Sequence, residues 1–386
     1  MSALPSTLEI LDRLVAFPTI SSDSNLALIE WAADRLDAAG AQVEVMPALE
    51  EGKANLFATI GPERAGGIVL SGHTDVVPVA GQPWTSDPFR LEERDGLLFG
   101  RGTADMKGFV AACIAMAPRF AAANLSRPVH FAFTYDEETG CLGGRELARA
   151  LSERDAKPAL AIVGEPTEMA IIEGHKGCHE YTTRFKGLAG HGSEPSRGVN
   201  AVEYAVRYIA KLLEIRDELA RSPIPGSRYV PPYSTVNVGI IHGGVAPNVI
   251  PDHAEVEWET RPVRAEDLVH VKETMARYAE ETLLPAMRAV SADAEIVTEV
   301  IGEVEGLEPM DENAARDLVT ELTGANATDV VSFGTEAGLF QSVGLSVVVC
   351  GPGSIQQAHK ADEFLAVSEL DACLGMLERL AGKLER

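Results

Sequence analysis

The segment SGHTDVVP, residues 71–78, places a histidine and a carboxylate at a spacing that suits metal chemistry. It follows a short apolar run, so we expect it at the end of a buried strand, where His73 and Asp75 point to the same side. In that arrangement His73 can bind a metal through one ring nitrogen, while Asp75 accepts a hydrogen bond from the other and fixes the tautomer. The alternative is a polar turn that ends a strand and has no further function.

Carboxylates recur in similar positions further along the chain. The loop GRGTADMKG, residues 100–108, delivers Asp105 to the start of a predicted helix, whose N-terminus favours a negative charge. A simple N-cap role is the alternative there. In TYDEETG, residues 134–140, the adjacent Glu137 and Glu138 cannot face the same way from an extended backbone. We therefore expect one of them to bind metal and the other to act as a base.

Two further candidate ligands end or follow apolar runs: Glu165 in GEPT and His359 after LSVVVCGPG. All five candidates thus lie beyond the carboxyl ends of predicted strands, where open α/β sheets place their sites. Three carboxylates and a bridging hydroxide balance the charge of two divalent ions. Two imidazoles complete a nitrogen and oxygen shell that suits Zn²⁺, with Co²⁺ or Mn²⁺ as alternatives. The chain contains no H-E-x-x-H, which disfavours a single-zinc peptidase.

The elements that carry these residues alternate between helical and strand patterns. Helices are expected at 5–16, opened by a capping box of Ser6 and Glu9, and at 25–39. A third helical stretch covers 106–120. Strands are expected at four short, almost wholly apolar runs: 67–71, 129–134, 160–163 and 345–350. This alternation predicts an α/β fold with a buried, mainly parallel sheet and helices on both faces.

The middle of the chain has a different order of elements. Between residues 178 and 302 the strands and helices follow the order βαββαβ, which can bury one sheet face under two helices. We therefore expect a catalytic domain made of residues 1–177 and 303–386. Residues 178–302 are expected to form an inserted α+β domain.

Composition limits the partners of the protein. The 386 residues carry a formal net charge of −25, which argues against nucleic acid or an anionic membrane as a partner. No segment approaches the ~18 uninterrupted apolar residues of a membrane span, and the N-terminus lacks the pattern of a signal peptide. The five cysteines are widely spaced, with no C-x-x-C pair, as in reduced cytosolic proteins. We expect a cytoplasmic protein that acts on small molecules.

Taken in order, SGHTDVVP, GRGTADMKG, DEETG, GEPT and the late His359 resemble the motifs of the di-zinc aminoacylase and deacylase family. The similarity covers essentially the whole chain. The resemblance implies that five side chains hold two zinc ions: His73 and Glu165 on one, Glu138 and His359 on the other, and Asp105 on both. A metal-free binding protein descended from such enzymes is the rival interpretation, and it would require lost ligands.

The resemblance also implies roles for residues that bind no metal. Glu137 would be the general base, and Asp75 would orient His73. The inserted domain of the family is a dimerisation domain, and its GHGSEP-type segment, here residues 190–195, carries a histidine that reaches the active site of the neighbouring subunit. That histidine is His191, so the resemblance predicts a homodimer.

Within the family, SGHTDVVPVAGQPWTSDPF, GEPTEMAIIEGHKG and SFGTEAGLF are most similar to the enzymes that release acetate from N2-acetylornithine in arginine biosynthesis. Thr335 and Glu336 lie in a turn that differs in desuccinylases, and Glu336 would pair with the free ammonium of ornithine. Its alternative role is that of a helix-start residue. Succinyl-diaminopimelate, another N-acyl amino acid and a dipeptide remain alternative substrates.

Two residues of the inserted segment occupy positions at which the family grips the substrate carboxylate, Asn248 and Arg261. Arginine suits this role because its planar fork binds a carboxylate at two points. An exposed strand cation without function is the alternative for Arg261.

Overall fold

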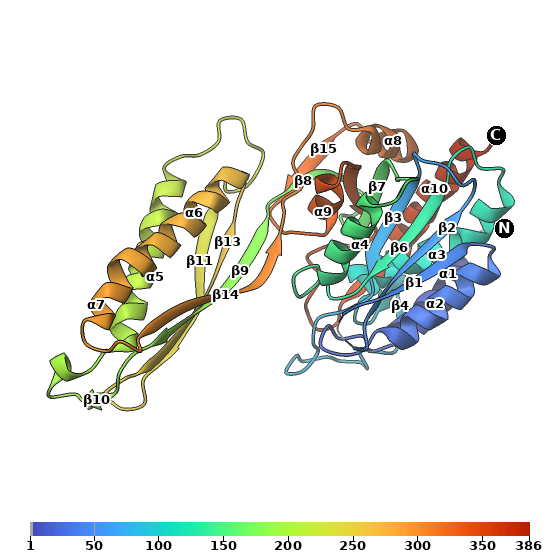
Figure 1. Ribbon diagram of the computed structural model, residues 1–386. Coiled ribbons are helices and arrows are strands. Elements are labelled where there is room, and N and C mark those ends of the chain that lie inside the picture. The colour runs from blue at the N-terminus through green and yellow to red at the C-terminus, as the bar shows by residue number, and fades with distance from the viewer. Residues whose placement is uncertain (1–2, 50) are drawn as a thin grey trace. The chain divides into compact units, whose positions relative to one another are not determined.

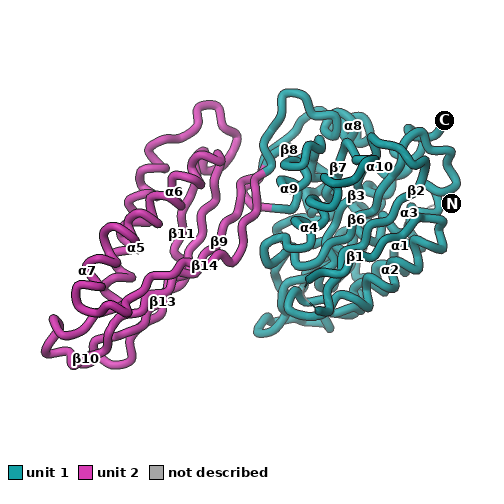
Figure 2. The backbone as a smooth tube through the Cα atoms, in the orientation of Figure 1, with its two compact units in different colours: residues 1–174, 307–330, 335–386 teal, residues 175–306, 331–334 magenta. Residues whose placement is uncertain are grey.

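The computed structural model describes residues 3–49 and 51–386, which form two compact units (Figure 2). Unit 1 is made of residues 1–174, 307–330 and 335–386, and unit 2 of residues 175–306 and 331–334. Each unit has its own hydrophobic core.

Unit 1 is built on an eight-stranded sheet in the order β1-β2-β6-β3-β7-β16-β8-β15 (Figure 1). The four central strands, β6, β3, β7 and β16, run parallel, whereas β1, β2 and β8 are antiparallel to their neighbours. The strands span Gln42–Pro47 (β1), Ala54–Ile60 (β2), Ile68–His73 (β3), Val129–Thr134 (β6), Leu160–Pro166 (β7), Ile171–His175 (β8), Thr328–Val331 (β15) and Ser346–Gly351 (β16). The predicted α/β fold with a mainly parallel sheet is confirmed.

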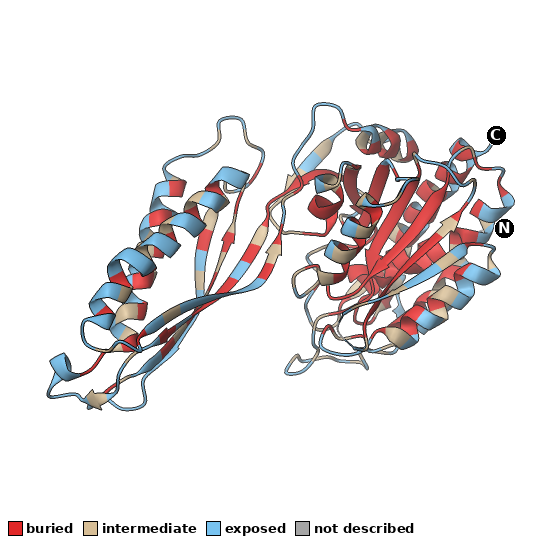
Figure 3. Ribbon diagram, viewed as in Figure 1, coloured by how far each residue is buried: buried red, intermediate tan, exposed pale blue. Residues whose placement is uncertain are grey.

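Helices cover both faces of this sheet. One face packs against five helices: α1 (Leu4–Val15), α2 (Leu26–Ala38), α3 (Gly108–Ala122), α8 (Ala314–Thr323) and α10 (Val367–Leu384). The other face carries α4 (Leu142–Ser152) and α9 (Ala337–Ser342). A small sheet formed by β4 (Glu92–Arg94), β5 (Leu97–Phe99) and β17 (Phe364–Ala366) contacts α10 and the turn before α3 through β17. The central strands are buried along their whole length (Figure 3), which explains why they are nearly all apolar.

Two local predictions for unit 1 are wrong. The capping box at the first helix does not form, because Ser6 lies inside α1 and its hydroxyl donates to the carbonyl of Ala3 at 2.8 Å. The helix expected from residue 106 begins at Gly108, because Asp105 and Met106 have non-helical backbone angles inside the π-helical segment Thr103–Lys107. Asp105 therefore projects from an irregular turn just before α3.

Unit 2 has one four-stranded antiparallel sheet in the order β11-β13-β9-β14. Helices α5 and α6 cover one face and enclose an aromatic core. Its main elements follow the expected βαββαβ order: β9 (Cys178–Lys186), α5 (Ala201–Ala220), β11 (Thr235–Gly243), β13 (His253–Arg261), α6 (Ala265–Tyr278) and β14 (Glu295–Val304). A π-helical turn (Ala279–Leu283) and α7 (Leu284–Arg288) extend α6. Across the described residues, no helix combines the length and apolarity of a membrane span.

Candidate metal-dependent active site

The five candidate metal ligands gather at one edge of the unit 1 sheet. His73 is the last residue of β3 and Glu165 lies near the end of β7. Glu138 follows β6, His359 follows β16, and Asp105 comes from the turn before α3. Because β6, β3, β7 and β16 are parallel, their carboxyl ends share this edge.

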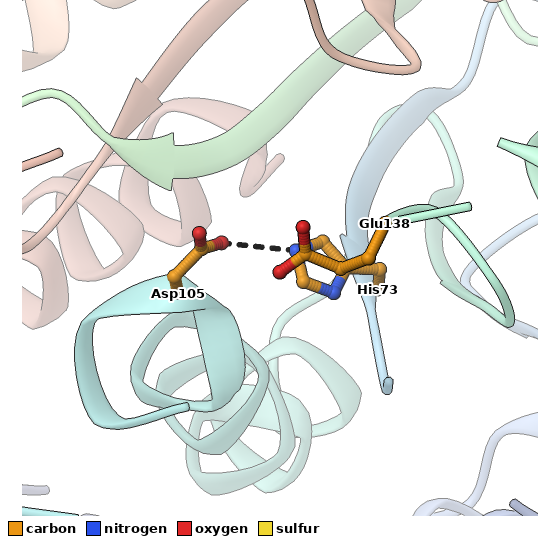
Figure 4. Close-up of side chains that lie close together, drawn as sticks. All are labelled: His73, Asp105 and Glu138. Atoms are coloured by element: carbon orange, nitrogen blue, oxygen red, sulfur yellow. Dashed lines mark hydrogen bonds and ion pairs between the residues drawn. The ribbon is translucent and has the colours of Figure 1, made fainter. Parts of the chain in front are cut away.

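Asp105 lies between two histidines. Its Oδ1 is 3.0 Å from His73 Nε2 (Figure 4), and its Oδ2 is 3.4 Å from His359 Nε2. The two oxygens of one carboxylate thus face two different imidazoles. This is the arrangement required of a ligand that bridges two ions.

The remaining carboxylates extend this arrangement on both sides. Glu138 Oε2 is 3.0 Å from His359 Nε2, and Glu165 Oε1 is 3.8 Å from His73 Nε2. That oxygen of Glu165 is buried and, among the described residues, has no hydrogen-bond partner. Ligand atoms of His73, Asp105 and Glu138 lie within 4.8 Å of one another, as do those of His73, Glu137 and Glu165. The donor set and its unpartnered oxygen fit divalent cations.

The charges of the cluster point to the same ligand class. Burial raises the pKa of Glu137 to about 8, and the nearby charge of Glu138 adds to that rise. Burial and the charge of Asp105 raise the pKa of Glu165 well above its ordinary value. Burial alone would raise the pKa of Asp105, but hydrogen bonds from His359 and His73 lower it. The raised pKa values mean that the four buried carboxyl groups do not all ionise readily side by side, and bound divalent cations would supply the missing counter-charge.

Asp75 supports the site in a different way from the one expected. His73 Nδ1 lies 2.9 Å from the main-chain carbonyl of Asp75, whereas the nearer carboxylate oxygen is 3.6 Å away. The carboxylate instead accepts hydrogen bonds from the Ser21 hydroxyl at 2.6 Å and from the main-chain N–H groups of Glu137 at 3.1 Å and Glu138 at 3.3 Å. Asp75 therefore orients the histidine with its backbone and the two glutamates with its side chain.

Other supporting residues were not foreseen from the sequence. The buried Lys53 donates to Asp136 at 2.6 Å, and Asp136 immediately precedes Glu137. The Cys141 thiol donates to Glu137 Oε1 at 3.3 Å. Asp136 is the first residue of the DEETG motif and Cys141 directly follows it, so both could have been singled out from the sequence. Lys53 is remote in sequence and carries no comparable signal.

Glu336 does not lie where the predicted ammonium-binding role requires. Its side chain is 1% exposed, and its two oxygens accept hydrogen bonds from Ser71 at 2.6 Å and Thr134 at 2.8 Å. Glu336 does lie at the start of α9, as its alternative role expected, although its side chain makes no cap hydrogen bond. The Thr335 hydroxyl instead accepts from the Ala337 N–H. The structure thus corrects the expectation for Glu336, whose carboxylate joins the ends of β3 and β6.

The candidate residues of unit 2 fall into two groups. Strand β10 (Gly190–His191) pairs with β12 (Val249–Ile250), and the Gly192 N–H donates to the Asn248 carbonyl at 2.8 Å. His191 and Asn248 are therefore neighbours, and both are exposed.

Arg261 lies apart from that pair within unit 2. It ends β13 and donates to Glu259 at 2.9 Å. Strand β13 has nine residues. At about 3.3 Å per residue its two ends are roughly 26 Å apart. Asn248 belongs to the end at which β13 begins, so Asn248 and Arg261 of one chain do not share a binding site.

The histidines and carboxylates at this sheet edge could hold divalent metal ions. The model of peptidase family M20/M25/M40 matches residues 69–383, and the chain belongs to this family. It is a metal-dependent amidohydrolase that acts on small-molecule substrates.

Relatives agree with this assignment over nearly the whole chain. The acetylornithine deacetylase of Photorhabdus laumondii is 37% identical over 95% of this chain and 94% of its own length. That of Pasteurella multocida is 36% identical over 99% of each chain. Among solved structures, the M20 family metallo-carboxypeptidase Sso-CP2 from Sulfolobus solfataricus has a TM-score of 0.76 at 17% identity and covers 98% of both chains. Human carnosine dipeptidase 1 has a TM-score of 0.73 at 19% identity, over 99% of this chain and 97% of its own.

Proposed function

We propose that the protein hydrolyses N2-acetylornithine to ornithine and acetate, a step of arginine biosynthesis. The observation that carries this proposal is the similarity, at 36–37% identity over nearly full length, to relatives named acetylornithine deacetylase. A cytoplasmic location is part of the proposal, supported by five widely spaced cysteines that include no C-x-x-C pair.

We propose two Zn²⁺ ions as the metals, with Co²⁺ or Mn²⁺ as substitutes. His73 and Glu165 would hold one ion, Glu138 and His359 the other, and Asp105 both, in keeping with the distances in unit 1. Such ions, when bound, lower the pKa of a water molecule and polarise the substrate carbonyl.

Glu137 has the position and environment of a general base. It lies within the buried carboxylate cluster, and two supports hold it: the Asp75 carboxylate at its main-chain N–H and the Cys141 thiol at its Oε1. In the proposed reaction Glu137 takes a proton from the attacking water, which adds to the amide carbon. It then delivers that proton to the nitrogen as the carbon–nitrogen bond breaks, leaving acetate and the free amine.

We propose that unit 2 completes the site through a homodimer, with residues 178–302 as the dimerisation domain. His191 and Asn248 lie side by side on the surface of unit 2, where a second copy of the chain can be reached. His191 would stabilise the developing oxyanion in the site of that second copy. Asn248 and Arg261 would bind the substrate carboxylate from different chains, because Asn248 lies near the start of β13 and Arg261 at its far end.

A substrate panel tests the activity. Purified protein reconstituted with zinc is assayed at one enzyme concentration against acetylornithine, succinyl-diaminopimelate, acetylmethionine and a dipeptide. The proposal expects the highest kcat/KM for acetylornithine. A higher value for any other member of the panel would reassign the substrate, and metal analysis of the same preparation tests the count of two ions per chain.

A further inference from the structure

Glu363 lies four residues after His359, and its buried carboxylate accepts hydrogen bonds from the loop that carries Asp105. Its side chain is fully buried. Its Oε2 accepts from the Gly102 N–H at 2.9 Å, and its Oε1 accepts from the N–H groups of Ala104 at 2.9 Å and Asp105 at 3.1 Å. Three main-chain groups of one loop are thus held by a side chain that follows the last candidate ligand.

Arg101 connects this carboxylate to the loop of His359. Its buried guanidinium donates through Nη1 to Glu363 Oε2 at 2.8 Å and to the Lys360 carbonyl at 3.2 Å. Through Nη2 it donates to Gln82 Oε1 at 2.6 Å, and Gln82 Nε2 in turn donates to the His359 carbonyl at 3.0 Å. One arginine therefore joins the loop of Asp105 to the main chain at His359 and Lys360.

The loop of His359 depends on such support. The His359 side chain is 53% exposed, so packing alone does not hold it. Its backbone has a φ of +63°, and Asp362 has a φ of +56°, both in the left-handed region that L residues seldom adopt. The Asp362 carboxylate accepts from the main-chain N–H of Thr85 at 2.9 Å. Contacts from outside the loop thus stabilise an unfavourable local conformation.

We propose that the buried Arg101–Glu363 pair is a positioning element that fixes the main chains at Asp105 and His359 relative to each other. The proposal rests on the metal-binding roles proposed above. Because the two oxygens of Asp105 face the two histidines, a small shift of one loop separates donor atoms that must meet one ion. Neither Arg101 nor Glu363 would touch metal or substrate; both act through the ligands.

Zinc affinity of the full chain tests this role directly. Glu363→Gln keeps the size of the side chain but turns an NH₂ group toward main-chain donors and leaves Arg101 without its counter-charge. We expect zinc to bind 10- to 100-fold more weakly, measured by competition with a chromogenic chelator. Arg101→Lys keeps the charge but cannot reach three acceptors at once, so we expect a smaller loss. Turnover at saturating zinc should lose kcat while KM changes little.

A matched control separates positioning from general stability. Glu173 is also a buried carboxylate of unit 1, and it accepts hydrogen bonds from Arg316 at 3.0 Å and Thr328 at 2.6 Å. It lies in β8, and these two partners belong to α8 and β15, neither of which carries a candidate ligand. Glu173→Gln should lower thermal stability but leave zinc affinity unchanged.

The outcomes distinguish the possible failures. If Glu363→Gln loses stability as Glu173→Gln does but binds zinc as tightly as the unchanged protein, the positioning role is overturned. If Glu363→Gln does not fold, zinc affinity is measured for Arg101→Lys, the milder change, and for Gln82→Ala at a half-buried residue. Unchanged zinc affinity in both variants would overturn the proposal. Failure of the substrate panel would refute the proposed function without changing the zinc measurement.

Discussion

The two units hold their candidate functional residues in opposite ways. In unit 1, Asp105 and Glu165 are 6% and 4% exposed, and their neighbours are held by buried hydrogen bonds. In unit 2, His191 lies in the short strand β10 and Asn248 directly precedes its partner strand β12, and both residues are exposed. Bond-breaking chemistry needs ligands fixed in a low-dielectric site, whereas groups that meet a second chain must lie on the surface.

The charged pairs of the two units follow the same division. Unit 1 contains the buried pairs Lys53–Asp136 and Arg101–Glu363, each beside a motif of the candidate site. In unit 2 Arg184 bridges acidic residues of two neighbouring strands on an exposed sheet face. Exposed pairs of this kind contribute little, whereas removing one partner of a buried pair leaves an unpaired charge. Substitutions in unit 1 should therefore have the larger consequences.

The largest effect is expected at Glu137. Glu137→Gln should lower kcat by about 10²- to 10⁴-fold, because proton transfer to and from the water and the amine is lost. Zinc content should stay near that of the unchanged protein, as measured by metal analysis. His359→Ala provides the contrast, since it should lose metal. If the Glu137→Gln protein lost metal but kept most of its turnover, Glu137 would be the metal ligand and Glu138 the general base.

The exposed His191 of unit 2 should affect the activity of the partner chain's site in the dimer and not that of its own chain. His191→Ala should lower kcat by about 10²- to 10³-fold through loss of oxyanion stabilisation. When Glu137→Ala and His191→Ala chains are unfolded together and reassembled, about half of the dimers are mixed, and each mixed dimer has one intact site. About a quarter of all sites should then recover activity. Each variant refolded alone is the control, and a mixture no more active than these controls would rule out a site shared between chains.

Substitution of Glu336 tests whether this motif residue stabilises the fold or binds the substrate. Because its carboxylate accepts from Ser71 and Thr134, Glu336→Gln should cost about 1.5–3 kcal/mol of stability in urea unfolding. Activity on acetylornithine and on acetylmethionine should fall by the same factor. A loss confined to acetylornithine would instead restore the ammonium-binding role.

The smallest effect concerns acid stability of the unit 1 core. Burial, and to a lesser degree the charge of Arg154, lowers the pKa of His130 to about 4. In the unfolded chain this histidine takes up a proton near pH 6.5, whereas in the folded chain it stays neutral down to about pH 4. The free energy of unfolding therefore falls as the pH drops from 7 to 5, by at most about 2 kcal/mol. His130→Asn should reduce this pH dependence in chemical denaturation measured at both pH values. The same substitution at the exposed His242 of unit 2 should leave it unchanged, and equal slopes in all three proteins would contradict the assignment.

Local patterns in the sequence were sufficient for the central strands of unit 1, for the main elements of unit 2 and for the residues of the candidate ligand cluster. Apolar runs followed by His73, Glu138 and Glu165 predicted strand ends, and parallel strands bring their carboxyl ends to one edge. The order of strands and helices in residues 178–302 likewise follows from periodicity. These features depend on residues close together in the chain, so the composition and spacing of short segments predict them.

The supports behind the site were decided by tertiary structure alone. Ser71 and Glu336 are 265 residues apart in sequence, and Asp105 and Glu363 are 258 apart. A hydrogen bond between residues so distant leaves no periodic signal in either segment. Packing therefore decided that Glu336 is buried beneath the strands, that the Asp75 carboxylate holds the glutamate turn, and that Glu363 holds the loop of Asp105. The sequence specified which side chains could bind metal, and the folded chain determined what holds them in place.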